Sequence, residues 1–161
     1  MANQLSQAIF HWLIGDVKNS NKKDGSFVFT MIENRRLTVK EQHDYAINLD
    51  TRFNFLELID VPAFAAACEE QWYNQTLCQV NDCVVRLGVM HGEFHWHKHD
   101  EEDEFFFVLQ GKFLIDLEGE TITLEPHQGC AIPRGVIHRT RAPERAVILM
   151  VEGSSVEPTG D

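Results

Sequence analysis

Short apolar runs separated by turn signals follow one another along the chain from Leu77 onward. Stretches such as "CVVRLGVM" and "AVILMV" alternate with turn-forming segments such as "QG", "EG" and "PRG". Short strands joined by tight turns are typical of an antiparallel sandwich or barrel. The pattern therefore predicts an all-β fold for this part of the chain.

The residues before this region have a different texture. Leu5, Ile9 and Leu13 follow a helical spacing that predicts a short helix ending near Gly15. The stretches "FVFTMIE" (residues 27–33) and "FNFLELI" (residues 53–59) have the composition of strands. We expect residues 1–60 to form an N-terminal extension that packs on the barrel or mediates dimerisation.

Residues 61–161 form the second predicted domain. Asp60 is placed to cap a helix with Pro62 in its first turn, and "AFAAACEEQW" (residues 63–72) continues it with good helix formers. At the other end, "SSVEPTGD" (residues 154–161) has no strand or helix pattern. We expect that tail to be extended and loosely held.

The stretch "HWHKHDEEDE" (residues 95–104) carries the most informative pattern in the sequence. Side chains alternate between the two faces of a strand, so His95, His97 and His99 point to the same side. Imidazole nitrogens inside a barrel need partners, and a metal ion supplies one partner for several of them. The acidic turn then brings Glu104, at the start of the return strand, beside the histidines.

A purely structural histidine cluster is the alternative to a metal site. His95 lies about 6 to 7 Å along the strand from His97, which is too far for easy coordination of the same ion. We expect His95 to face a substrate or support a metal ligand, with a structural hydrogen bond as the open alternative. The remaining histidines are interpreted as ordinary turn or surface residues: His11, His43, His91 and His127.

These residues resemble the two motifs of the cupin superfamily. The first motif, H-x-H followed by E and G, is matched through Gly111, and the second, P-x-G-x-x-H, is matched by "PRGVIH" (residues 133–138). The match to the core of the superfamily covers about residues 77–151, and the chain is similar to small single-domain bacterial cupins, including mannose-6-phosphate-isomerase-like proteins, over about residues 61–161. The resemblance implies a jelly-roll β-barrel that holds one divalent metal ion, Fe, Mn, Ni or Zn. The implied ligands are His97, His99, Glu104 and His138.

Two functions remain open at this point. The first is a metal-dependent enzyme, of dioxygenase or isomerase type, that acts on a small oxygenated metabolite. The second is a cupin that binds a metal and a small ligand without turnover, for storage or sensing. The apolar inward positions Phe106, Val108, Cys130 and Ile132 favour the second, and a fold by itself does not choose between them. No catalytic residue beyond the metal ligands is predicted.

Composition narrows the partners and the location. The formal net charge of −11 repels phosphate backbones and anionic lipid headgroups, so we expect neither nucleic acid nor membrane as a partner. The apolar run "AVILMV" is far shorter than the roughly 20 residues that cross a bilayer. The N-terminal residues lack the pattern of a signal peptide, and the cysteines form no C-x-x-C pair. We therefore expect a cytoplasmic protein with free thiols.

The predicted strand "EFFFVLQ" (residues 104–110) is apolar on both faces. With Glu104 pointing inward, Phe106 and Val108 share its face, while Phe105 and Phe107 point outward with Leu109. A strand with two apolar faces must be covered on both. The outer cover is predicted to be the N-terminal extension or a second subunit, and we expect a homodimer.

Overall fold

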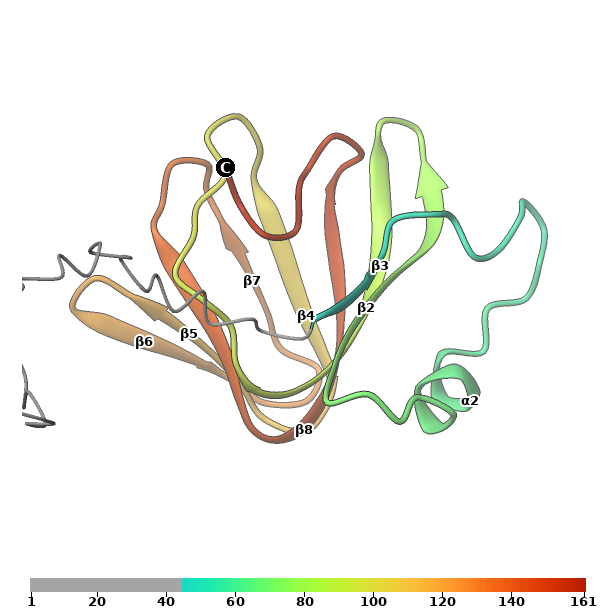
Figure 1. Cartoon of the computed structure of the whole chain (residues 1–161), viewed down its shortest axis with the longest axis horizontal. Helices are drawn as coiled ribbons and strands as arrows, with labels where there is room; N and C mark the ends of the chain where they lie inside the picture. Colours follow the sequence, from blue (N-terminus) through green and yellow to red (C-terminus); the bar gives the residue numbers. More distant parts are fainter. Residues whose placement is uncertain (1–44) are drawn as a thin grey trace, which may run out of the picture. The chain divides into compact units, whose positions relative to one another are not determined.

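The computed structural model describes residues 45–161, and the fold is given for these residues (Figure 1). They form an eight-stranded sheet and one short helix. The predicted helix near residues 5–13 and the predicted strand at residues 27–33 lie outside the described part. The elements are β1 (Ala46–Asn48), α2 (Val61–Ala66), β2 (Trp72–Val80), β3 (Cys83–Glu93), β4 (Glu104–Gln110), β5 (Phe113–Leu117), β6 (Glu120–Leu124), β7 (Gly129–Ile132) and β8 (His138–Gly153).

Strand β8 joins the two halves of the fold. Its first residues pair with β5, and its later residues pair with β3 on one side and β4 on the other. The sheet order is β1-β2-β3-β8-β4-β7, with the β5–β6 hairpin attached through β8. All of these pairs are antiparallel except β1 with β2. The predicted jelly-roll fold is confirmed, although the ring of strand pairing is open.

The alternation predicted for β4 is also confirmed. Glu104, Phe106 and Val108 are buried inside the sheet, with exposed fractions of 6%, 2% and 0%. Phe105 is 37% exposed on the outer side and packs beside Phe107. The inward face of β4 therefore carries one carboxylate in an otherwise apolar row.

Apolar side chains form two clusters on opposite faces of the sheet. The inner cluster fills the jelly roll and includes Phe106, Phe113 and Ile148. The outer cluster includes Leu77 and the partly buried Leu109, and residues from α2 and the segment before it pack against it. The chain itself therefore covers this part of the outer face of the sheet. The sequence pattern does not decide whether the chain or a second subunit provides this cover.

The helix that begins after Asp60 is shorter than predicted. The Asp60 side chain caps it by accepting a hydrogen bond from the backbone N–H of Ala63, at 3.0 Å, as expected. The helix ends at Ala66, however, and β2 begins at Trp72. Trp72 and Asn74 are both buried within β2, so burial on the inner face of the sheet overrides the helical propensity of the preceding residues.

The strand predicted at residues 53–59 is wrong. Phe53 donates a backbone hydrogen bond to Leu77 O, but the chain then turns, because the Asn54 N–H and side chain both bond the Glu57 carboxylate. Leu56 has a positive φ of 67° within this turn, which breaks a regular strand. Residues 45–60 nevertheless belong to the same compact unit as the barrel, which spans Glu41–Asp161.

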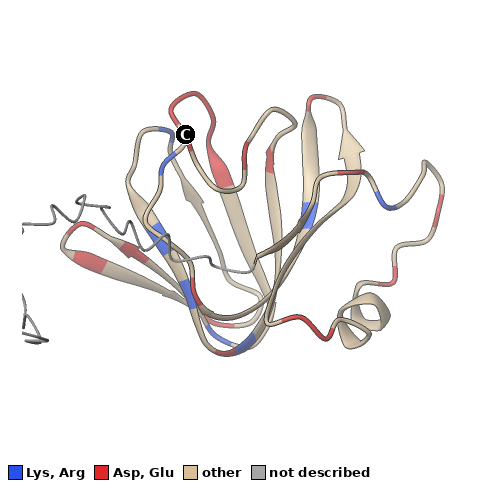
Figure 2. Cartoon of the chain, viewed as in Figure 1, with Lys and Arg blue, Asp and Glu red and all other residues tan. Residues whose placement is uncertain are grey.

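The tail at residues 154–161 is held more firmly than predicted. Val156 is only 5% exposed, and the Asp161 N–H donates to Lys98 O. Figure 1 shows the end of the chain beside the loop that precedes β4, and Figure 2 shows that this loop is acidic. Within the described residues, no helix combines the length and apolar character needed to span a bilayer.

The homodimer stays a prediction, and exposed apolar side chains in the segment before α2 offer a surface for it. Phe55, Leu56 and Leu58 are at least 85% exposed, and burying such a patch favours association. We expect the double substitution F55S/L56S to shift a dimer toward monomer in light scattering, while E118S on a distant hairpin leaves the mass unchanged. A monomeric wild-type protein at working concentrations would contradict the dimer.

Candidate metal centre

Three short pieces of chain meet at one end of the jelly roll. His97 lies in the irregular segment between β3 and β4, Glu104 is the first residue of β4, and His138 is the first residue of β8. His97 and His138 form an isolated antiparallel bridge in which each backbone N–H donates to the other carbonyl, at 2.9 Å. Backbone pairing therefore fixes the two imidazoles next to each other.

The side chains at this end converge. One potential ligand atom from each of His97, Glu104 and His138 lies within 4.8 Å of the others. The distance from His138 Nε2 to Glu104 Oε2 is 3.4 Å. His99 is outside this group of three, but its Nε2 is 3.7 Å from the same carboxylate oxygen. The structure thus brings together three of the predicted ligands and places the fourth beside the carboxylate.

Backbone carbonyls orient two of the imidazoles. His97 Nδ1 lies 3.1 Å from His95 O, and His138 Nδ1 lies 3.0 Å from Val136 O. A carbonyl only accepts, so each Nδ1 carries the proton and donates. In a neutral ring this leaves the Nε2 lone pair free, which is the arrangement seen in metal-binding histidines.

The buried polar atoms at the convergence point lack partners. His99 Nε2, His138 Nε2 and Glu104 Oε2 are buried and make no hydrogen bond within the described structure. Leaving such atoms unpaired costs about 1–3 kcal/mol each. Imidazole nitrogens with one carboxylate form a donor set that suits first-row transition metals. The residues present therefore fit a divalent metal ion.

The two bridging histidines have opposite pKa shifts. Burial lowers the pKa of His97 to about 4, and the neighbouring His138 lowers it further. Burial also opposes charge on His138, but the nearby Glu104 carboxylate and the hydrogen bond to Val136 O together outweigh burial and raise its pKa. His97 is accordingly neutral, and able to bind a cation, through the whole physiological pH range.

A buried ion pair lies beneath the carboxylate ligand. Glu152 of β8 is the register partner of Glu104 on β4, and it forms an ion pair with Arg86 of β3. Both side chains are at most 3% exposed. Burial and the nearby charge of Glu104 raise the pKa of Glu152. Arg86 therefore compensates a pair of neighbouring carboxyl groups that would otherwise repel each other.

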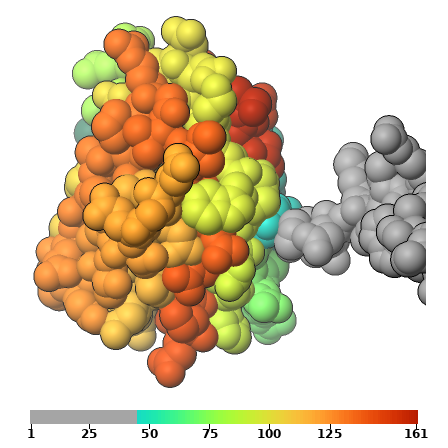
Figure 3. Space-filling view, turned by 90° about the vertical axis from the view of Figure 1, so that its left-hand side faces the viewer, coloured from blue at the N-terminus to red at the C-terminus, as the bar shows by residue number. Residues whose placement is uncertain are grey.

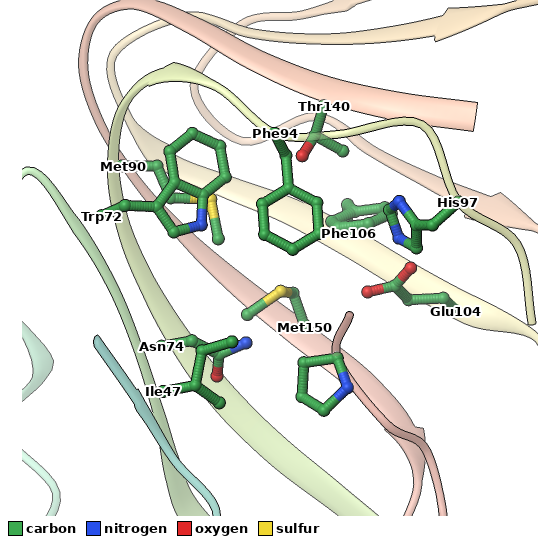
Figure 4. Close-up of a pocket in the computed structure, with 11 residues that line it drawn as sticks. Ile47, Trp72, Asn74, Met90, Phe94, His97, Glu104, Phe106, Thr140 and Met150 are labelled. Atoms are coloured by element: carbon green, nitrogen blue, oxygen red, sulfur yellow. The ribbon is translucent and has the colours of Figure 1, made fainter. Parts of the chain in front are cut away.

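A pocket of about 20 Å³ adjoins His97 and Glu104 (Figure 4). That volume holds an ion or one water molecule. His97 and Glu104 line one side of it, and Asn74 of β2 lies on the opposite side in the close-up. The walls between them are mainly apolar and include Trp72, Met90, Phe94, Phe106 and Met150.

Sequence reasoning missed most of this pocket. Asn74 is 5% exposed, and its Oδ1 has no hydrogen-bond partner in the described structure. The alternation of Trp72, Asn74 and Thr76 on one face of β2 is the signal for this strand, but the predicted helix extends to Trp72 and hides the start of the pattern. Phe94 stacks on Trp72 with ring centroids 5.4 Å apart, a contact that no local pattern indicates.

His95 does not join the converging group. Its Nε2 lies 2.7 Å from Thr159 O, so the ring donates to the tail. Its own carbonyl accepts the hydrogen bond from His97 Nδ1. Of the roles considered from the sequence, the geometry favours support of a metal ligand.

Comparison with known proteins places this architecture in a family. The family model "Cupin domain" matches residues 84–152. A crystal structure of a cupin-2 domain containing protein from Shewanella frigidimarina is 30% identical, with a TM-score of 0.58, over 60% of this chain and 94% of that chain. The chain therefore belongs to the cupin family.

Two curated proteins show similarity in sequence. YdbB of Bacillus subtilis (strain 168), described as uncharacterized, is 43% identical over 96 residues, which span 59% of this chain and 85% of YdbB. CurC of Streptomyces cyaneus, named as a polyketide synthase, is 42% identical over 58 residues, 36% of each chain. The similarity to YdbB covers most of that protein, whereas the similarity to CurC covers about a third.

The metal-free protein should lose stability as the pH falls from 6.5 to 4. Between pH 6.5 and 4, His97 becomes protonated in the unfolded chain, whereas burial keeps it neutral in the folded protein down to about pH 4. The free energy of unfolding should fall by up to about 3 kcal/mol from this group. Denaturant titrations in chelator across the pH range measure the loss.

The variant H97Q is the control, because glutamine does not titrate. Its profile should lack the His97 contribution and keep that of the ordinary carboxylates. The raised pKa of His138 acts in another window, since its stabilisation is present below pH 6.5 and is lost as the pH rises through the folded value. Identical profiles for wild type and H97Q below pH 6.5 would contradict the assignment.

Proposed function

We propose that this protein is a metal-dependent cupin enzyme that acts on a small oxygenated metabolite. One divalent ion, of Fe, Mn, Ni or Zn, is held at the end of the jelly roll next to the apolar pocket. The proposed ligands are His97, His99, Glu104 and His138.

One observation carries this proposal. Unpartnered ring nitrogens of His99 and His138 and an unpartnered oxygen of Glu104 are buried around one point. Folding would not retain three such atoms in one place without compensation, because each loses its hydrogen bonds to water. A shared cation would compensate all of them at once.

The chain's own residues define what the site can do. Three neutral imidazoles and one carboxylate would hold the ion, which would supply Lewis-acid or redox chemistry to a bound oxygen atom. Trp72 and Phe94 cover the apolar side of the pocket and limit the access of water. The pocket admits only a small group, so the Asn74 amide, opposite the ligands, would hydrogen-bond a substrate oxygen that enters it.

The pocket also narrows the substrate class. No Lys or Arg is found among the described residues that line it, and Arg86 is engaged with Glu152. Phosphate groups are usually recognised by Arg, Lys or clusters of backbone N–H groups. The lining therefore favours entry of a hydroxyl, carbonyl or carboxylate oxygen over entry of a phosphate group.

Non-catalytic binding is the alternative function. It is favoured by the absence, among the described lining residues, of an acid or base besides His97 and Glu104. Such a protein would hold its metal and a small ligand without converting the ligand. Turnover distinguishes the two functions.

Elemental analysis of protein purified without chelators tests for the metal. Anaerobic reconstitution with Fe(II), Mn(II), Ni(II) or Zn(II), followed by oxygen-uptake and isomerisation assays, tests for turnover. The panel should contain phenols, hydroxy acids and keto acids, and the name of CurC adds polyketides. Product formation with one metal supports the enzyme, whereas saturable binding without product supports the alternative.

The double variant H97A/E104A should lose bound metal. It removes one imidazole and the only carboxylate of the proposed set, so the metal content should fall about tenfold or more relative to the wild-type protein. The matched control H91A/E101A removes an exposed histidine and an exposed glutamate and should retain full content. Equal metal stoichiometry in both variants would refute the proposed ligands.

Asn74 should matter for the ligand but not for folding. N74V and T76V each remove a buried oxygen that has no partner, so neither should lower the free energy of unfolding, and each should raise it by about 1 kcal/mol. Only Asn74 lines the pocket. N74V should therefore weaken binding of the compound selected from the panel, and T76V should not. Equal effects of both variants on binding would contradict a ligand contact at Asn74.

A further inference from the structure

The tail of the chain lies against the segment that carries the histidines. We propose that residues 156–161, here called the C-terminal strap, are part of the metal centre and position its ligands, with Gly160 as the residue that allows the close approach. This proposal rests on the proposed metal site but concerns a segment outside both cupin motifs.

The first link between the strap and the site is a relay of two hydrogen bonds. His95 Nε2 donates to Thr159 O at 2.7 Å, and His97 Nδ1 donates to His95 O at 3.1 Å. The second bond fixes the ring of His97 with its Nε2 free. Partners of this kind orient a metal-binding imidazole and increase its affinity for the ion.

The second link is a close packing contact at Gly160. Gly160 has φ +84°, and a Cβ built there would lie 2.6 Å from His97 Cβ and 3.0 Å from Lys98 O. No real side chain tolerates these distances without displacement of its neighbour. The strap backbone thus lies directly on the His97 side chain and the Lys98 carbonyl, and only glycine permits that separation.

The third link holds the loop that follows His97. The Asp161 N–H donates to Lys98 O at 3.1 Å, and the Asp161 carboxylate accepts from the Asp100 N–H at 2.6 Å. His99, the fourth proposed ligand, lies between these two anchored residues. In Figure 3 the red C-terminal residues lie against the yellow-green and yellow segment that leads into β4.

The strap also reaches the opposite side of the site. Val156 O accepts a buried hydrogen bond from Arg86 Nη2 at 3.3 Å, and Arg86 pairs with Glu152 next to Glu104. Pro158, two residues farther on, lines the pocket itself. One short segment therefore contacts the His97 side chain and the backbone of Lys98 and Asp100, the ion pair behind the proposed carboxylate ligand, and the pocket.

Ordinary packing of a tail predicts a different outcome from positioning of a metal site. Packing would contribute to the free energy of unfolding alone. Positioning requires that displacement of the strap by a few tenths of an ångström weakens the metal site of a protein that is still folded. The substitution G160A produces such a displacement.

The test compares G160A with G119A. Both place alanine at positive φ, +84° and +90°, but a Cβ at residue 119 meets nothing within 4 Å. G119A therefore reproduces the backbone strain without the contact. We expect G160A to weaken Zn(II) binding, measured by chelator competition, by about 10- to 100-fold, and to change the Co(II) absorption spectrum. G119A should match wild type in both measurements.

Equal Zn(II) affinity and Co(II) spectra in wild type and G160A would overturn the proposal. If G160A does not fold, D161A and D161N decide the question, because asparagine keeps an oxygen that accepts from Asp100 N–H and alanine does not. D161A should weaken Zn(II) binding and D161N should retain most of the affinity. Equal, wild-type affinity in both would also overturn the role of the strap.

A readout without metal separates this proposal from the proposed function. In metal-free protein, the amide of Asp100 should exchange with deuterium faster in D161A than in D161N, which shows whether the strap orders the loop. Wild-type protein that binds no metal would refute the metal site, and the strap's role in it, whatever the exchange rates. If the wild-type protein and G160A bind Zn(II) equally tightly, the role of the strap is refuted and the metal site is not.

Discussion

The desolvation of a few polar atoms is the constraint on which the rest of this structure depends. The jelly roll encloses an apolar core at one end and, at the other, imidazoles and carboxyl groups whose usual partners in water have been removed. Such a concentration of polar groups is tolerated inside a protein only when they compensate one another or a bound ion compensates them. Arg86 compensates Glu152, and the converging histidines with Glu104 remain for a cation.

Strand β8 makes this arrangement possible because it belongs to both halves of the fold. Its first residue, His138, pairs with β5 and bridges to His97, whereas Glu152 near its other end pairs with Glu104 on β4. A strand that bends between the two halves of one sheet delivers groups from distant positions to one side of the interior. The site is thus a property of the strand order and not of any single loop.

Local periodicity made part of the site predictable from the sequence. The sequence predicts that strand alternation places His97 and His99 on one face, with Glu104 returning beside them after a short acidic turn. The segment between β3 and β4 is irregular apart from the bridge at His97, so the two imidazoles lie close together, 5.3 Å between ring centroids, without a regular strand. His138 is far along the chain from them, so only resemblance to a family motif connected it with the others. The sequence did not indicate Asn74, because its burial depends on the pairing of β2 with β3. The helix-forming residues before Trp72 favour a helix there and do not predict this strand.

The other wrong predictions, for residues 53–59 and for the C-terminal strap, also have their causes in the tertiary structure. Residues 53–59 have a strand composition, and Phe53 bonds to Leu77 of β2, but the Asn54–Glu57 contacts then turn the chain. The strap is attached largely through backbone atoms and a glycine, and neither leaves a hydrophobic pattern that could be recognised in advance.

The central place of β8 has a consequence for the order in which the protein folds. Contacts between β8 and strands that precede it by many residues must form before the ligand set is complete, and long-range pairing of this kind is slow. During synthesis the ribosome releases β3 and β4 before β8. A nascent chain therefore lacks the complete set of proposed ligands until β8 has paired, so binding of the proposed metal would be a late event in folding.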